Sequence, residues 1–164
     1  MLRAFACGLV LLGGSLGAPA RADHFTIDLE VKTPDAAKAA HAEAAGIGVK
    51  PKARGVLEAR AGARLTAGWT LTSVAPKAKF KNVLVHFFVV KEDQVGQQVV
   101  PKLDKEVWVE TALTMDFNPG DKNQGELSFV IDKPGTYLLR LETIGAAVGI
   151  EGHEHFAALD LVVR

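Results

Sequence analysis

Two histidines near the C-terminus, His153 and His155, are separated by one residue in the sequence GHEHF. Residues two apart on a β-strand project to the same side, and imidazole is a common ligand of copper and zinc. A third histidine, His86, lies in the apolar segment NVLVHFFVV. These residues suggest a copper or zinc site, formed where the strand of His86 and the last strand flank a common neighbour.

The same histidines also have a purely structural interpretation. His155 shares its alternation with Ala157 and Leu159, which places it at the edge of the core. A histidine in such a position is more often held by hydrogen bonds than bound to a metal. His86 shares a face with Phe88 on a strand that is apolar on both sides. We therefore favour the interpretation that these histidines are polar residues at the point where a strand enters the sandwich. The metal site is the alternative.

His24 offers a separate route to copper. If a leader is removed after Ala22, His24 becomes the second residue of the mature chain. The free amine, a backbone nitrogen and the imidazole then have the geometry to chelate Cu(II). The simpler interpretation is an exposed polar residue at a frayed terminus.

The first 22 residues have the pattern of a secretory signal peptide. Arg3 precedes an apolar run, and small residues follow it, so that cleavage fits after Ala20 or after Ala22. We favour Ala22, which leaves residues 23–164 as one exported domain in the periplasm or outside the cell. No later stretch approaches the ~20 apolar residues of a transmembrane helix.

Composition excludes several classes of function. Without Arg3 and Arg21 the chain has 17 basic and 19 acidic residues, a formal charge of −2, and no basic face typical of nucleic-acid binders is indicated. The single cysteine, Cys7, lies within the predicted leader, so no disulfide is expected. No nucleophile with a base and no phosphate-binding glycine loop stands out, and we predict a protein that is not an enzyme.

Alternation with a period of two residues dominates the mature sequence and indicates half-buried strands. Eight segments show it or a related apolar pattern: 24–32, 56–60, 64–74, 82–92, 106–117, 125–132, 135–143 and 155–163. Between the first two, Thr33 as N-cap, Pro34 after it and Gly46 as a stop predict a short alanine-rich helix over residues 34–45, with a loop as the alternative.

Two features predict a surface that is covered by another part of the chain or contacted by a partner. The strand around His86 is apolar on both faces, which requires a cover: the alanine-rich helix, a protein or cell-surface partner, or a second copy of the chain. Trp108 alternates with Glu106 and Glu110 and is expected to point outward, whereas Trp69 is expected in the core.

These patterns predict an all-β fold, a two-sheet antiparallel sandwich of seven or eight strands with one short helix. The segment DKPGTYLLRLE resembles the corner of immunoglobulin-like and fibronectin-like domains, in which a tyrosine bonds back to the preceding turn. Tyr137 occupies that position. Residues 82–164 are also similar to uncharacterised exported bacterial proteins that end in a comparable GHEHFAALDL segment, a likeness that implies no activity.

The sequence therefore predicts an exported, non-catalytic binding or structural module with an immunoglobulin-like fold and an unidentified ligand. The alternative is a periplasmic copper or zinc protein that uses His86, His153 and His155, with or without His24.

Overall fold

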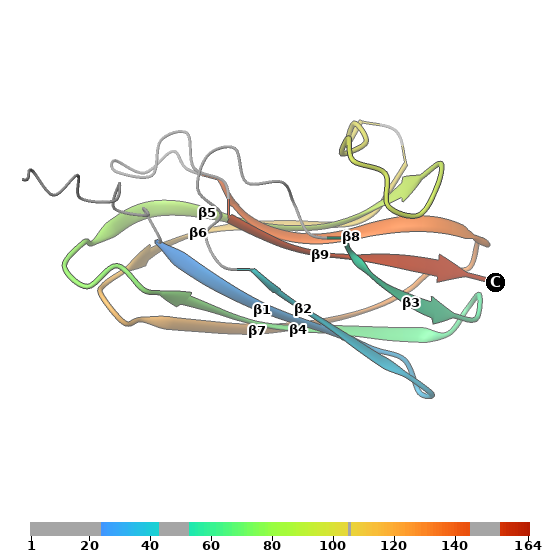
Figure 1. Ribbon diagram of the computed structural model, residues 1–164, viewed down its shortest axis with the longest axis horizontal. Coiled ribbons are helices and arrows are strands. Elements are labelled where there is room, and N and C mark those ends of the chain that lie inside the picture. Colours follow the sequence, from blue (N-terminus) through green and yellow to red (C-terminus); the bar gives the residue numbers. More distant parts are fainter. Residues whose placement is uncertain (1–23, 43–52, 105, 145–154) are drawn as a thin grey trace, which may run out of the picture.

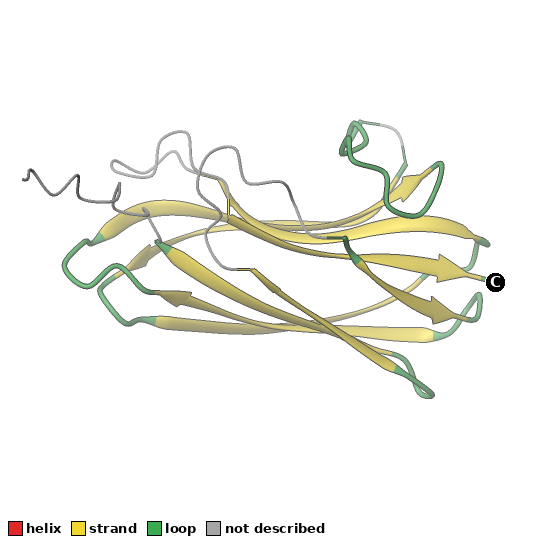
Figure 2. Cartoon of the chain, in the orientation of Figure 1, coloured by secondary structure: helices red, strands yellow, loops and turns green. Residues whose placement is uncertain are grey.

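The chain folds into nine β-strands within the residues that the computed structural model describes, which are 24–42, 53–104, 106–144 and 155–164. No helix occurs among them (Figure 2). The strands are β1 (Phe25–Lys32), β2 (Ala37–Ala42), β3 (Gly55–Ala59), β4 (Arg64–Ser73), β5 (Phe80–Glu92), β6 (Val107–Phe117), β7 (Lys122–Val130), β8 (Gly135–Ile144) and β9 (His155–Val163).

The strands form two sheets packed face to face (Figure 1). One sheet has four strands in the order β2-β1-β4-β7, and the other has five in the order β3-β9-β8-β5-β6. Neighbours run antiparallel except for β3 and β9, which are parallel. The predicted two-sheet all-β sandwich is confirmed and broadly fits an immunoglobulin-like arrangement, with nine strands among the described residues instead of seven or eight.

The core lies between the sheets and follows the predicted alternation. In β1, Phe25, Ile27, Leu29 and Val31 are all buried, because every second side chain of a strand faces the same side. Tyr137 is fully buried at the start of β8, and its hydroxyl donates a hydrogen bond of 2.8 Å to the carbonyl oxygen of Lys133. This is the bond back to the corner that the sequence predicted.

The alanine-rich segment is an edge strand, so the helix predicted over residues 34–45 is wrong for its described part. Residues 37–42 form β2, which pairs antiparallel with β1. Thr33 makes the contacts of a predicted N-cap, accepting hydrogen bonds from the backbone of Asp35 and Ala36, but the chain then reverses into a hairpin. Alanine side chains bury too little area to dock a helix, whereas pairing with β1 satisfies the backbone of the segment. Residues 43–45 lie outside the described residues.

The apolar outer face of β5 is covered by the chain itself. Phe88 and Val90 form a small cluster with Leu138 of β8, and Leu103 and Val107 pack against it. Leu103 belongs to the segment between β5 and β6, which lies over the five-stranded sheet (Figure 1). Neither the predicted helix nor a partner is needed over this part of the sheet.

Trp108 points toward the core, contrary to the sequence prediction. Val89 pairs with Val109 and Val90 with Val107, so Trp108 is an extra residue at a β-bulge. A bulge shifts the alternation by one position. The Trp108 ring consequently packs edge-on against Tyr137, with 5.8 Å between ring centroids.

Trp69 lies at the core, as predicted, in a space that Gly125 leaves open. Trp69 is half-buried and stacks on Phe87, with a centroid distance of 5.8 Å. Gly125 of β7 pairs directly with Trp69, and a Cβ atom built at Gly125 would overlap Cζ2 and Cε2 of the indole. A strand glycine here permits the close approach of the ring to the neighbouring backbone.

Candidate functional sites

His86 lies on the outer face of the five-stranded sheet, between two carboxylates. Its Nδ1 is 3.1 Å from Oε1 of Glu142 and its Nε2 is 3.0 Å from Oε1 of Glu110. Arg140 also contacts Glu142 through Nε, and its guanidinium stacks 3.8 Å from the centroid of the Phe156 ring. The two basic and two acidic side chains form a compact network in which basic and acidic groups alternate.

His155 lies on the opposite face of the same sheet. It is 2% exposed and packs edge-on against Phe25 of the other sheet, 5.6 Å between centroids. Its Nδ1 is 3.3 Å from Oγ1 of Thr143. Because His86 projects outward and His155 inward, the described strands do not bring these two predicted ligands together. His153 lies outside the described residues.

His24 and His155 approach each other at one end of the core. Their ring centroids are 5.8 Å apart, and Phe80 lies beside His24 at 5.2 Å. His24 precedes β1 in one sheet, and His155 begins β9 in the other, so the pair joins the two sheets. Within the described ranges, no group of three or more His, Cys, Asp or Glu side chains has the arrangement of a metal site.

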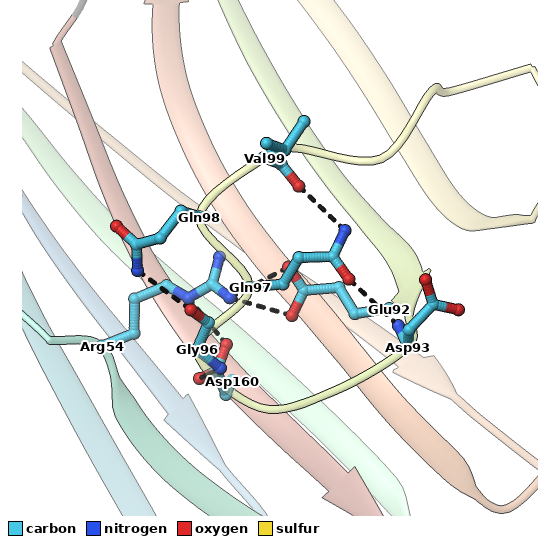
Figure 3. Close-up of polar contacts among 8 residues, drawn as sticks. All are labelled: Arg54, Glu92, Asp93, Gly96, Gln97, Gln98, Val99 and Asp160. Atoms are coloured by element: carbon cyan, nitrogen blue, oxygen red, sulfur yellow. Dashed lines mark hydrogen bonds and ion pairs between the residues drawn. The ribbon is translucent and has the colours of Figure 1, made fainter.

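A buried ion cluster that the sequence did not reveal joins Arg54, directly before β3, to β5 and β9 (Figure 3). The Arg54 guanidinium lies 2.9 Å from both carboxylate oxygens of Glu92, and its Nε lies 2.7 Å from Oδ1 of Asp160. Both carboxylate side chains are 0% exposed. The backbone N–H of Gly96 donates to Asp160 as well, at 2.8 Å, so the cluster also fixes the loop after β5.

The electrostatics of this cluster are set by burial. Removal from water raises the pKa of Glu92 above its usual range, and the nearby Arg54 opposes that increase. Asp160 stands between Leu159 and Leu161 in the last strand. An acid inside such an apolar run needs a partner, and this was the available sequence signal for the cluster.

A shallow groove of about 500 Å³ crosses the outer face of the four-stranded sheet. Its floor is the backbone of one row of paired residues, Ala40, Leu29, Trp69 and Gly125, one from each strand. The side chains of this row point toward the core, and the neighbouring rows stand outward as walls. One wall consists of His41, Asp28, Thr70 and Gln124, and the other contains Ala39, Glu30 and Gly68.

The groove walls are held by side-chain hydrogen bonds. Asp28 Oδ1 lies 2.6 Å from His41 Nδ1, and Gln124 Nε2 donates to Thr70 Oγ1 at 3.2 Å. On the other wall, Glu30 contacts Lys32 at 2.7 Å, and this hydrogen bond raises the pKa of the Lys32 ammonium. Gly68 leaves that wall low, because a Cβ atom there would meet nothing nearer than a backbone oxygen at 4.0 Å.

Comparisons with known proteins assign no family to the chain. No family model matches it, and no curated protein matches it in sequence. Among solved structures it is similar to the C-terminal domain of Wzt, with 11% identity, a TM-score of 0.44, and coverage of 83% of this chain and 70% of that one. It is also similar to the PmoD soluble domain from Methylocystis sp. ATCC 49242 (Rockwell), with 13% identity, a TM-score of 0.45, and coverage of 84% and 90%. No helix in the described part of the chain is long and apolar enough to span a membrane.

Proposed function

We propose that this protein is an exported, non-catalytic binding module whose ligand is an extended, hydroxyl-rich glycan strand. The observation that carries the proposal is the groove across the four-stranded sheet. Four strands span about 14 Å at their usual spacing of about 4.8 Å. A groove of that length, running across the strands and lined by polar walls, suits an elongated ligand.

The chemistry of the groove walls favours hydroxyl groups as the recognised feature. Carboxylate, imidazole, hydroxyl and amide groups alternate along the walls, and together they offer both donors and acceptors of hydrogen bonds. The two acids of the groove, Asp28 and Glu30, are each paired with a basic group. A neutral ligand with many hydroxyls therefore matches the groove better than a highly charged one.

The arrangement of buried ionisable groups supports a module without catalytic activity. Glu92, whose pKa burial raises, is enclosed by Arg54 and lies in the other sheet. His86 is held between two carboxylates on the outer face of that sheet. These groups have structural partners, whereas a general acid or base must face the substrate. The leader pattern of residues 1–22 supports export.

Filling the groove tests the proposal. We expect Gly68→Thr to weaken glycan binding at least about tenfold, because a side chain on the low wall occupies the space of the ligand. The measurement is calorimetric titration with neutral hexasaccharides of the chitin and cellulose types, combined with amide NMR shifts. Thr72→Ile is the control, since it adds bulk to β4 on the same face outside the groove. Absence of shifts at groove residues with both sugars would contradict the proposal.

The His24–His155 pair favours metal binding as a second candidate function. Metal–nitrogen bonds of about 2.0 Å place two imidazole rings on one ion with centroids about 5 to 6 Å apart. The observed centroid distance is 5.8 Å, and copper or zinc suits imidazole ligands. His153, two residues before His155 in the sequence, is then the candidate for a third ligand.

Titration of the mature chain with Cu(II) and with Zn(II) separates this candidate from the first. We expect one ion per chain, with His24→Ala and His155→Gln each weakening binding by about 100-fold, because each removes one ligand of the site. His86→Gln is the control and leaves binding unchanged, since His86 lies on the opposite face. If no ion binds stoichiometrically, or if binding survives both substitutions, the metal function is excluded.

A further inference from the structure

The segment after β5 lies over the outer face of the five-stranded sheet without joining it (Figure 1). Residues 93–104, here called the strap, contain turns and bends but no strand. Toward one end the strap packs through Leu103 against the apolar cluster around Phe88. Toward the other end, the backbone N–H of Gly96 donates to Oδ2 of Asp160 at 2.8 Å (Figure 3). Both contacts hold the strap against the sheet.

Two glutamines order the strap internally. The backbone N–H of Asp93 donates to Gln97 Oε1 at 3.2 Å, and Gln97 Nε2 donates to the carbonyl oxygen of Val99 at 2.9 Å. Gln98 Nε2 donates to the carbonyl oxygen of Gly96 at 2.9 Å. Detaching the strap from the sheet leaves these bonds intact and breaks no strand pairing.

Next to Gly96, two buried carboxylates share one guanidinium group. The side chains of Glu92 and Asp160 are 0% exposed, and both contact Arg54. The buried group has one negative charge in excess when both acids are ionised, and such a pair of carboxylates binds a proton more readily than either acid alone. Burial raises the pKa of Glu92, Arg54 lowers it, and the neighbouring Asp160 raises it again.

We propose that the strap is a proton-controlled latch, closed over the sheet when Glu92 and Asp160 share a proton and released when both carboxylates are ionised. β5 and β9 are each paired with a strand on both sides, which prevents them from moving apart to admit water. No described strand pairs with the strap, so its displacement is the local opening that brings water to the two charges. Solvation of the charges then relieves their repulsion.

Among the described residues, the charged groups that face Glu92 are those of the cluster itself. Arg54 comes from the segment before β3, and Asp160 comes from β9. β8 contributes Thr136, which pairs with Glu92 and does not titrate. The carboxylate of Asp93, at the start of the strap, points away from the cluster (Figure 3). The proton therefore acts on the two acids that share Arg54.

Proton linkage sets the direction of the switch. With the strap closed, the pKa of Glu92 is raised, and with the strap open, water returns it toward its ordinary value of 4.5. Between these two pKa values the closed state binds more protons than the open state. The extra stability of the closed strap is therefore lost as pH rises through the pKa of the closed state. Each unit of separation between the two pKa values shifts the equilibrium about tenfold.

Release of the strap changes the surface of the five-stranded sheet. Phe88, Val90 and Leu138 are at most 1% exposed with the strap closed, and they lose the cover of Leu103 when it opens. The groove crosses the other sheet, so the latch and glycan binding are independent. Failure of one does not imply failure of the other.

Amide hydrogen exchange between about pH 4 and pH 8 tests the latch, because the Gly96 amide forms one of its bonds. NMR gives the protection factor of each amide, which removes the intrinsic effect of pH on exchange. We expect the protection factor of Gly96 to fall at least about tenfold as pH rises. Glu92→Gln imitates the protonated acid and keeps Gly96 protected over the whole range. The Leu29 amide in β1 reports global unfolding.

Glu106→Gln is the matched control, because Glu106 is an acid just beyond the strap that is 59% exposed and pairs with Lys91 at 3.4 Å. It leaves the pH dependence of Gly96 unchanged. The proposal is overturned if the protection factor of wild-type Gly96 does not vary with pH, or if Glu92→Gln retains the wild-type dependence. Parallel loss of protection at Leu29 and Gly96 also overturns it, since the pH effect then belongs to global unfolding.

Discussion

Arg54→Met will lower the free energy of unfolding by about 3–5 kcal/mol. The substitution keeps most of the side-chain volume but leaves Glu92 and Asp160 buried without their cation, and breaking a buried ion pair in this way has a cost of that size. Both carboxylates are 0% exposed. Urea unfolding at pH 7, followed by circular dichroism, measures the difference from the wild type.

Arg164→Met provides the control for this prediction. Arg164 pairs with Glu58 at 2.9 Å, but 71% and 62% of the two side chains are exposed. Exposed pairs contribute about 0–1 kcal/mol. If the two arginine substitutions destabilise the protein equally, the buried cluster is not the source of the effect.

The pH dependence of stability follows from the same cluster. Burial raises the pKa of Glu92 in the folded protein above its ordinary value of 4.5. Between these two pKa values the folded state binds more protons than the unfolded state, so stability decreases as pH rises through this window. Arg54 opposes this increase, so the pKa of Glu92 is higher still in the Arg54→Met variant. The free energy of unfolding of that variant therefore increases as pH falls and Glu92 takes up a proton. Glu92→Gln in the Arg54→Met background reduces this recovery, because it removes one of the two buried carboxylates, and urea midpoints between acidic and neutral pH will measure the reduction.

Gly125→Ala is expected to reduce stability by about 1–3 kcal/mol, the usual cost of overpacking a filled site. The new Cβ atom overlaps the Trp69 ring, which is held between Gly125 and Phe87. The ring must shift, and the backbone of β7 must move with it. Thermal unfolding gives the loss of stability, and the emission spectrum of tryptophan reports the displaced ring.

Gly68→Ala is the matched control, because Gly68 is a strand glycine in the same sheet with open space around it. Alanine is favoured over glycine inside a strand by roughly 0.5–1 kcal/mol, so Gly68→Ala is expected to be neutral or slightly stabilising. Equal losses at Gly68 and Gly125 would show that strand glycines matter here for their backbone alone and not for the space they give Trp69.

The sequence predicted the fold well where one face of a strand is apolar and the other polar. β1 is the clearest case, because its alternation alone identifies the buried residues. The sequence-based prediction was wrong at Trp108, because a bulge that shifts the alternation cannot be recognised from the pattern of a single strand. It also failed at residues 37–42, where alanines fit a helix locally but have little to bury in one.

The candidate sites depended on information that alternation does not carry. His86 was placed on the same face as Phe88, which is correct, but a strand that is apolar on both sides does not reveal which face is the inner one. The Arg54 cluster and the groove require pairing registers between strands far apart in sequence. Asp160, an acid in an apolar strand, was the one residue whose position in the sequence indicated a buried ion pair.

The parallel pairing of β3 with β9 has a consequence for how the molecule is made. β9 is the last strand of the sandwich in chain order, yet it lies inside the five-stranded sheet, between β3 and β8. The backbone N–H of Arg164 also bonds to the carbonyl of Ala59, about a hundred residues earlier. Such distant contacts form late in folding. Until residues 155–163 have been synthesised, the sheet is split, and the growing chain has no closed sandwich to form.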